Sequence, residues 1–353
     1  MSPSPPFPVL AAGDRFIRSA IFRAEITDRL GSRAAVSELE LPWPDEPFGA
    51  VAEVDEASGS EDELIDALRG HRGLVTQLAP ITERALSAVP ELEFIGVGRG
   101  GPVNINVEAA AARGVRIVNV PGRNGIATAE MTLALLLAAL RRLPALHGSL
   151  LRREWRGDFY RHDVVGGEIS GSTIGLLGAG AVGQHVARIV AAMGAEVVVH
   201  DPYLPAGALP EARRCADLDE LFSTSDVLSV HARLTPETEQ VVNAKRIALM
   251  RPGAILVNAA RGGLVDYAAA AEALATGQLG GVAVDVFPTE PVDMSLRLLQ
   301  LADEGANVVL APHVAGASRE TARRAAGGMA EELRRYLGGE PALHPVRPRA
   351  VTS

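Results

Sequence analysis

The sequence has 353 residues, of which 47% are hydrophobic, and a formal net charge of -9 at pH 7. At about 150 residues per domain, this length predicts two domains, each with its own core. The acidic balance, with no run of Lys and Arg, argues against nucleic acid or an anionic membrane as the main partner. A single cysteine, Cys215, excludes an intramolecular disulfide and a cysteine metal cluster, so we expect no metal and a reducing, cytoplasmic location.

The ends of the chain and its apolar runs predict neither export nor a membrane span. The N-terminus lacks the basic stretch and apolar core of a signal peptide. The longest apolar run, 131–140, is shorter than the roughly 20 residues that cross a bilayer. We therefore expect a soluble protein.

The first 120 residues alternate apolar runs with amphipathic stretches. Stretches such as 61–69 and 107–113 carry apolar residues at helical spacing. Strand-type runs that alternate with helices predict an open parallel sheet with helices on its faces. The runs that we expect to form strands are 8–12, 34–41, 49–54, 73–76, 94–98 and 115–118.

A glycine-rich loop, 98–104, directly follows one of these runs. In open α/β sheets, ligands bind at the carboxyl ends of the strands. Arg99, beside the exposed backbone of Gly100 and Gly101, suits an anionic group through charge-assisted hydrogen bonds. A flexible turn without a ligand is the alternative interpretation.

A long Ala- and Leu-rich stretch, 127–141, follows a turn at 120–125. It is apolar almost all round, so we expect a helix buried between domains or against another subunit. Glu130 lies within it and is expected to have a hydrogen-bond partner, since an unpaired buried charge is costly. Residues 151–172 have the composition of an irregular connection.

Residues 173–183, TIGLLGAGAVG, have the pattern of a strand, a tight turn and a helix. Gly178 allows the turn, Gly180 lets the backbone approach a pyrophosphate, and Gly183 permits close packing of helix and strand. The N–H groups at the start of the helix favour phosphate. An ordinary glycine-rich turn is the alternative. The predicted cofactor-binding residues here are Gly178, Gly180, Ala181, Val182 and Gly183.

Asp201 indicates which dinucleotide the glycine-rich turn would bind. It follows the apolar run 196–199 and lies eighteen residues after Gly183. A carboxylate at this position accepts hydrogen bonds from ribose hydroxyls and repels a 2'-phosphate. The sequence therefore predicts NAD rather than NADP and disfavours a methyltransferase.

The alternation of predicted strands and helices continues to residue 310. Strands expected at 173–177, 196–200, 227–231, 254–258, 281–286 and 308–310 would make a six-stranded doubly wound sheet. Helices are expected at 218–223, 244–249 and 267–276. A further helix, 320–337, is expected to return to the first domain, and the tail from Pro341 to be disordered.

Three segments with chemically active side chains follow the last three of these strands. They carry Arg261, Glu290 and His313. Because the carboxyl ends of parallel strands meet at one edge of a sheet, we expect the three segments to converge at the nicotinamide. Each residue alone also has a structural interpretation, as an ion-pair partner, a loop carboxylate or a capping histidine.

Five blocks in this order, GLLGAGAVG, HDPY, VNAARGGLVD, GVAVDVFPTEP and APHVAGAS, resemble the signatures of the D-isomer-specific 2-hydroxyacid dehydrogenase family. The resemblance extends over residues 73–326. It implies a Rossmann NAD-binding domain (123–318) inserted into a flavodoxin-like substrate domain (1–122 and 319–353). It also implies a homodimer, with the helix at 127–141 as the interface, and a small 2-keto or 2-hydroxy acid as substrate.

The resemblance further implies a role for each site residue. His313 would be the acid/base paired with Glu290, and Arg261 would orient the substrate carboxylate. Asp285 would bind the nicotinamide amide, and the loop at Arg99, Gly100 and Gly101 would hold the substrate carboxylate through its backbone. Ala259 and His313 are also counted among the cofactor-binding residues. The expected reaction reduces a 2-keto acid to a D-2-hydroxy acid with hydride from NADH, and a histidine suits the proton because imidazole titrates near neutrality.

Three departures from the family pattern matter. Ala232 and Arg233 stand where the family has a Pro-Leu-Thr turn, so we expect Arg233 to alter the adenosine end. The loop 99–104 lacks the aspartate that is common near its end in the family, so the family pattern does not identify the substrate. From Arg99 and the polar loop we expect a hydroxylated acid of sugar type. No regulatory domain is expected after residue 345.

An NAD-sensing corepressor-like interaction protein stays the alternative function, because such proteins keep the same residues.

Overall fold

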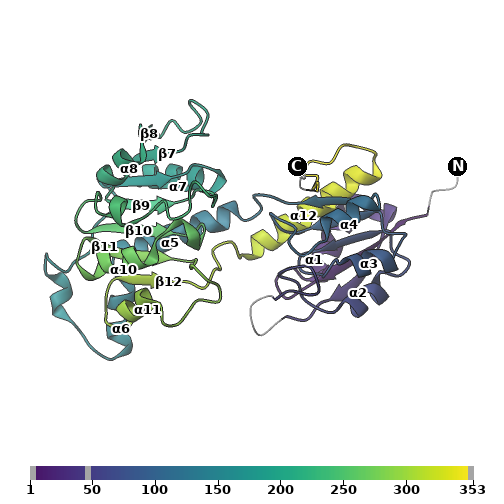
Figure 1. Ribbon diagram of the computed structural model, residues 1–353, viewed down its shortest axis with the longest axis horizontal. Helices are drawn as coiled ribbons and strands as arrows, with labels where there is room; N and C mark the ends of the chain where they lie inside the picture. Colours follow the sequence, from purple (N-terminus) through teal and green to yellow (C-terminus); the bar gives the residue numbers. More distant parts are fainter. Residues whose placement is uncertain (1–4, 44–48, 349–353) are drawn as a thin grey trace. The chain divides into compact units, whose positions relative to one another are not determined.

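The computed structural model describes residues 5–43 and 49–348. The chain divides into two compact units, residues 1–123 with 318–353 and residues 124–317. Each unit has its own parallel sheet (Figure 1) and its own hydrophobic clusters of buried side chains. The predicted class, two doubly wound parallel-sheet α/β domains, is confirmed.

In the first unit the described residues form a five-stranded sheet in the order β2-β1-β3-β4-β5, with every pair parallel. This is the flavodoxin-like order. Consecutive side chains of a strand point to opposite faces of the sheet, so each strand contributes residues to the hydrophobic cluster on either face. The strands are β1 (Phe7–Gly13), β2 (Ala34–Glu40), β3 (Gly73–Thr76), β4 (Phe94–Val97) and β5 (Arg116–Asn119).

Helices cover both faces of this sheet. Leu10 and Ala12 of β1 pack with α2 (Glu61–Leu68), α3 (Glu83–Ala88) and α4 (Val107–Ala112). Val9 and Ala11 point the other way. They pack with α1 (Ser19–Leu30) and α12 (Arg319–Leu337), and a short turn of 3-10 helix, η1 (Gly31–Arg33), follows α1.

Two expectations for this unit are wrong. Residues 49–54 form a tight turn closed by an antiparallel bridge between Val51 and Val54, not a strand of the sheet. The tail is ordered over residues 341–348, because buried Glu332 accepts the backbone N–H groups of Leu343 and His344. Val346 also donates its N–H to the carbonyl of Ile117 in β5. Residues 349–353 of the expected tail lie outside the described residues.

In the second unit the sheet has the order β12-β11-β10-β9-β6-β7-β8, again all parallel. This is the Rossmann order with β12 added at one edge. We predicted six strands, and the described residues form seven, because β8 is three residues long and has no apolar run. The strands are β6 (Thr173–Leu177), β7 (Glu196–His200), β8 (Ala212–Arg214), β9 (Val227–Val230), β10 (Ala254–Asn258), β11 (Leu279–Val284) and β12 (Val308–Leu310).

The helices of this unit also form two layers. On one face pack α5 (Gly125–Leu140) and α7 (Ala181–Ala192). The other face is covered by α8 (Leu218–Thr224), α9 (Ala244–Ile247), α10 (Tyr267–Ala275) and α11 (Arg297–Asp303). The remaining helical elements are α6 (Leu143–Leu151), η2 (Gly157–Tyr160) and η3 (Gly262–Leu264).

The long apolar helix α5 packs on its own sheet. Ala129, Leu136 and Ala139 are buried against α7 and the strands. The opposite side is open, with Ile126 41% exposed. Glu130 is exposed too, so the expectation that its carboxylate is buried was wrong.

Candidate active site

The glycine-rich turn between β6 and α7 has the shape of a phosphate cradle. Gly178 has a φ of 93°, and a Cβ there would lie 2.8 Å from the backbone nitrogen of Ala232. At Gly183 a Cβ would lie 2.5 Å from the carbonyl oxygen of Gly178. A Cβ on Gly180 would meet no atom within 4 Å, so the space over this turn is open. The first N–H groups of α7, at Ala181 and Val182, face no partner within the helix. These residues fit the pyrophosphate of a dinucleotide.

Asp201 is fixed beside this turn by two backbone donors. Its Oδ2 accepts the N–H of Ala179 at 2.7 Å, and its Oδ1 accepts the N–H of Tyr203 at 2.8 Å. An ionised carboxylate has about four acceptor positions, so two stay available for hydroxyl groups. The carboxylate is therefore held in one orientation by the backbone, with acceptor positions left over for a ligand.

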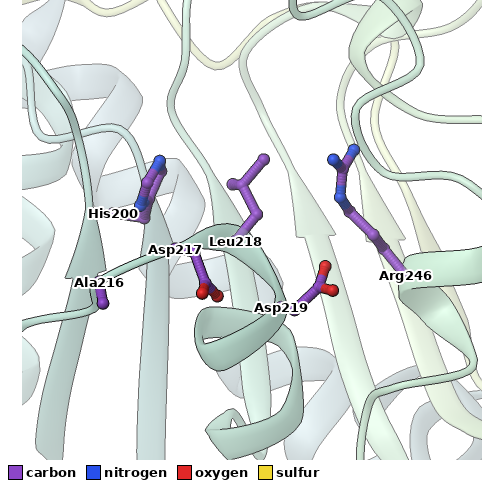
Figure 2. Close-up of a pocket in the computed structure, with 6 residues that line it drawn as sticks. All are labelled: His200, Ala216, Asp217, Leu218, Asp219 and Arg246. Carbon is purple, nitrogen blue, oxygen red and sulfur yellow. The ribbon is translucent and has the colours of Figure 1, made fainter.

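A pocket of about 400 Å³ lies next to Asp201, at the carboxyl end of β7. Figure 2 shows His200 and Arg246 on either side of Leu218, with two aspartates where α8 begins. An apolar side chain between a flat ring and a guanidinium suits a planar heterocycle. The sequence predictions missed this pocket, and Arg233 is not part of its lining. The lining residues are His200, Ala216, Asp217, Leu218, Asp219 and Arg246.

Asp285 joins the segments that follow β11 and β12. Its side chain is fully buried and accepts the N–H groups of Val314 and Ala315, each at 2.8 Å. The His313 N–H donates to the Asp285 carbonyl at 2.7 Å. Burial raises the pKa of Asp285, and the two backbone hydrogen bonds oppose that effect. The carboxylate thus holds the turn in which His313 has a φ of 54°, a conformation uncommon outside glycine.

His313 and Glu290 form a pair. The Nδ1 of His313 lies 2.5 Å from Oε2 of Glu290, whose Oε1 accepts the N–H of Phe287 at 3.0 Å. The imidazole is 48% exposed. A carboxylate against Nδ1 sets the tautomer with hydrogen on Nδ1, which leaves the lone pair of Nε2 to exchange a proton.

Arg261 is presented by the turn that follows β10. The side-chain amide of Asn258 holds this turn with two hydrogen bonds. Its Oδ1 accepts the N–H of Ala260 at 3.0 Å, and its Nδ2 donates to the carbonyl of Arg261 at 2.9 Å. Ala259 between them is buried. The side chain of Arg261 is exposed and donates to the Ala260 carbonyl at 2.6 Å. In the described part of the chain no carboxylate pairs with this guanidinium, so it is available to an anionic ligand.

The predicted substrate loop lies in the first unit, after β4. Gly100 and Gly101 are exposed, and Asn119 donates its amide to the Gly100 carbonyl at 2.9 Å. The Arg99 carbonyl accepts the N–H of Val120 at 3.1 Å. The guanidinium of Arg99 pairs with the carboxylate of Glu56, and the Arg99 side chain is 18% exposed. The loop is therefore anchored to the end of β5 while its glycines stay open.

Two residues near Arg99 were missed by the sequence analysis. Arg123 has a buried Nε without a hydrogen-bond partner among the described residues. Burial and the like charge of Arg99 lower the pKa of Arg123 to about 10. Asp14, fully buried after β1, has an unpartnered Oδ2, and burial raises its pKa. Both follow strand ends, as Arg99 does, and that position was the available signal.

The fold and these groups define a class of protein, the α/β proteins that bind a nicotinamide dinucleotide on a Rossmann sheet. Residues 133–315 match the family model described as D-isomer specific 2-hydroxyacid dehydrogenase, NAD binding domain. The chain belongs to the D-isomer-specific 2-hydroxyacid dehydrogenase family. The predicted family and the predicted cofactor, NAD, are thereby confirmed.

The chain is similar to several named D-3-phosphoglycerate dehydrogenases. It is 38% identical over 320 residues to that of Mycobacterium tuberculosis, covering 89% of this chain and 57% of the relative. With that of Methanocaldococcus jannaschii the identity is 37% over 302 residues, covering 84% and 56%. The chain thus spans less than two thirds of the length of these relatives.

Solved structures share the fold. The TT0316 protein from Thermus thermophilus superposes with a TM-score of 0.74 at 32% identity, covering 96% of this chain and all of that one. A D-lactate dehydrogenase with NAD+ from Lactobacillus jensenii has a TM-score of 0.77 at 24% identity, covering 97% and 100%. At that identity the second comparison speaks for the fold alone.

Two features are absent from the part of the chain that the structure describes. None of the helices is long and apolar enough to cross a membrane. No group of three or more His, Cys, Asp and Glu side chains is placed to hold a metal ion.

Proposed function

We propose that this chain catalyses the NAD-dependent interconversion of a 2-keto acid and a D-2-hydroxy acid. The observation that carries the proposal is the pair of His313 and Glu290 at the carboxyl edge of the NAD-binding sheet. An arginine without a carboxylate partner among the described residues, Arg261, belongs to the same unit. NADH bound to the glycine turn and Asp201 supplies the hydride.

In this proposal His313 handles the proton. Glu290 accepts the hydrogen on Nδ1 and holds the ring, so that Nε2 gives a proton to the carbonyl oxygen during reduction. In the reverse direction Nε2 takes the hydroxyl proton, and the carboxylate of Glu290 stabilises the imidazolium that forms.

Arg261 orients the substrate. A guanidinium binds a carboxylate through two parallel hydrogen bonds, which sets both position and rotation. Correct orientation of the carbonyl toward the hydride accounts for much of the rate in reactions of this kind. Asp285 is assigned to the nicotinamide amide, in addition to holding the turn with His313, and Ala259 to the cofactor.

The loop at Arg99, Gly100 and Gly101 is proposed to hold the substrate from the first unit. Its exposed glycines offer backbone N–H groups, and Arg99 and Arg123 give the surroundings a positive charge. These features favour an acid with further polar or anionic groups. A hydroxylated acid of sugar type fits this description, and the name of the curated relatives, D-3-phosphoglycerate dehydrogenase, points to a phosphorylated member of that class.

The test is an assay of NADH oxidation with a panel of 2-keto acids that includes pyruvate, hydroxypyruvate and 3-phosphohydroxypyruvate. Turnover with at least one acid is expected, and H313A should abolish it while NADH still binds. No turnover with any acid, combined with NADH-dependent binding of a protein partner, would support the corepressor-like alternative instead.

We also propose a homodimer in the cytoplasm. Besides Ile126 in α5, apolar side chains are exposed in and after α6, where Leu150 is 58%, Leu151 69% and Trp155 86% exposed. Exposed apolar side chains this close together are typical of a protein interface. Light scattering should report twice the mass of one chain, and a monomer would contradict the dimer.

A further inference from the structure

Tyr267 lies at the start of α10, next to the segment that carries Glu290. It is 3% exposed, and its hydroxyl donates a hydrogen bond to the carbonyl of Val286. The capping residue Asp266 accepts the N–H of Ala269 at 3.0 Å and so sets where the helix begins. The phenol therefore reaches the loop after β11 from a rigid element.

The Val286 carbonyl, which the Tyr267 hydroxyl binds, lies beyond the end of β11. Val284 and Asp285 still pair with the neighbouring segment, accepting the N–H groups of Ala311 at 2.9 Å and His313 at 2.7 Å. Val286 comes next and is 1% exposed, which keeps its carbonyl from water. A buried carbonyl without a partner is unfavourable, and the Tyr267 hydroxyl is the partner found among the described residues.

The same peptide group also binds Glu290. The carbonyl of Val286 and the N–H of Phe287 belong to one planar peptide, and that N–H donates to Oε1 of Glu290 at 3.0 Å. If the plane turned over, the N–H would point away from the carboxylate. A donor on the carbonyl also polarises the peptide and strengthens the hydrogen bond made by its N–H.

The arrangement links this loop to the Arg261 segment. Tyr267 follows Arg261 by six residues. Next to Arg261, the carbonyl oxygen of Phe287 lies only 1.8 Å from the position that a Cβ on Gly262 would occupy. The rings of Tyr267 and Phe287 are 6.4 Å apart. The two segments are therefore in direct contact, and the Tyr267 hydroxyl binds the loop after β11.

We propose that Tyr267 is a positioning residue, whose hydroxyl fixes the Val286–Phe287 peptide so that its N–H holds Glu290 against His313. This inference rests on the proposed function, because it concerns the same acid/base pair. Burial also raises the pKa of Tyr267, so the phenol keeps its proton and stays a donor throughout the neutral range.

The first experiment compares Y267F with Y336F. Tyr336 is the matched control, because its hydroxyl donates a hydrogen bond to Glu93 at 2.8 Å, in the first unit. We expect Y267F to lower kcat roughly tenfold while the KM for NADH and for the keto acid change less than about twofold. Y336F should leave all three unchanged. An equal loss in both variants, or a loss confined to KM, would overturn the proposal.

A double-mutant cycle asks whether the hydroxyl acts through Glu290. In the E290Q background, Y267F should lower kcat no further, because the carboxylate that it positions is already gone. Losses that multiply in the double variant would show that Tyr267 acts elsewhere, and would overturn the proposal.

A readout without turnover separates this inference from the proposed function. In the 15N NMR spectrum of histidine-labelled protein, the Nδ1–H signal of His313, identified by its absence in H313A, should shift in Y267F and in E290Q but not in Y336F. An unchanged signal in Y267F would overturn the positioning role. That result is independent of whether any keto acid is turned over.

Discussion

Glu290 and His313 lie 23 residues apart in the chain, yet Oε2 of one is 2.5 Å from Nδ1 of the other. Each is held by backbone. Glu290 accepts the N–H of Phe287, and the His313 N–H donates to the carbonyl of Asp285. The pair is thus oriented by its loops before a substrate binds, as efficient proton transfer requires.

The first prediction follows from this pair. E290Q should lower kcat roughly 100-fold, because a neutral amide does not stabilise the imidazolium. NADH affinity, measured by fluorescence titration, should stay within about twofold of wild type. Glu304, an exposed carboxylate of the same unit, is the control, and E304Q should behave as wild type. Wild-type kcat in E290Q would remove Glu290 from the mechanism.

The second prediction concerns Arg261. R261K should lower kcat/KM for the keto acid roughly 100-fold, because lysine keeps the charge but loses the two parallel hydrogen bonds. R213K changes an arginine of the same unit that pairs with surface carboxylates, and should have no effect. Steady-state kinetics at saturating NADH measure both, and equal values for the two variants would contradict the role of Arg261.

The third prediction tests Asp201 as the residue that selects NAD. D201N should weaken NADH and improve NADPH, so that the ratio of their kcat/KM values falls about tenfold or more, because the repulsion of a 2'-phosphate is lost. D303N, at an exposed position in α11, should leave the ratio unchanged. A ratio preserved in D201N would show that the discrimination lies elsewhere.

The fourth prediction separates two glycines of one turn. A methyl group on Gly183 would lie 2.5 Å from the Gly178 carbonyl oxygen, so G183A should reduce the free energy of unfolding by about 1–3 kcal/mol. G180A places its methyl in open space and should fold normally, but raise the KM for NADH roughly tenfold. Denaturant unfolding and kinetics measure the two effects. The prediction fails if G180A binds NADH like wild type.

The fifth prediction is a pH dependence of stability. Burial lowers the pKa of His231 to about 4, from 6.5, and its Nε2 lies 2.9 Å from Oγ of Ser229. Because the folded pKa is depressed, the neutral ring favours folding above pH 6.5, and this contribution is lost as the pH falls toward 4. From pH 7 to pH 5 it should fall by about 2 kcal/mol.

H231Q supplies the comparison, because an amide can bind Ser229 but does not titrate. Urea unfolding at pH 7 and pH 5 should show a smaller loss of stability for H231Q than for wild type. Identical losses in the two proteins would place the acid sensitivity in other groups.

Much of the fold could be predicted because its signals are local. Apolar runs such as 227–230 and 254–258 became buried strands, and the glycine spacing at Gly178, Gly180 and Gly183 predicted the turn between β6 and α7. The exceptions carried no such signal. Strand β8 is short and charged at its end, and the tail is held by a buried glutamate 11 and 12 residues earlier in the chain, Glu332.

For the candidate site, sequence was enough to predict the family, the cofactor and the residues expected at the carboxyl ends of the strands, Arg261, Glu290 and His313. Parallel topology alone brings such strand ends to one edge of a sheet, so the pattern of strands and helices is sufficient to predict that these residues share an edge. Their roles stay predictions for the experiments above.

The packed fold was needed to establish which atoms face one another. It brought Nδ1 of His313 to Glu290, took up both oxygens of Asp285 with backbone N–H groups, and placed the hydroxyl of Tyr267 on the peptide that binds Glu290. The physical reason is that these contacts join separate elements of the sheet. They depend on how helices and loops pack, which a pattern of three or four neighbouring residues does not encode.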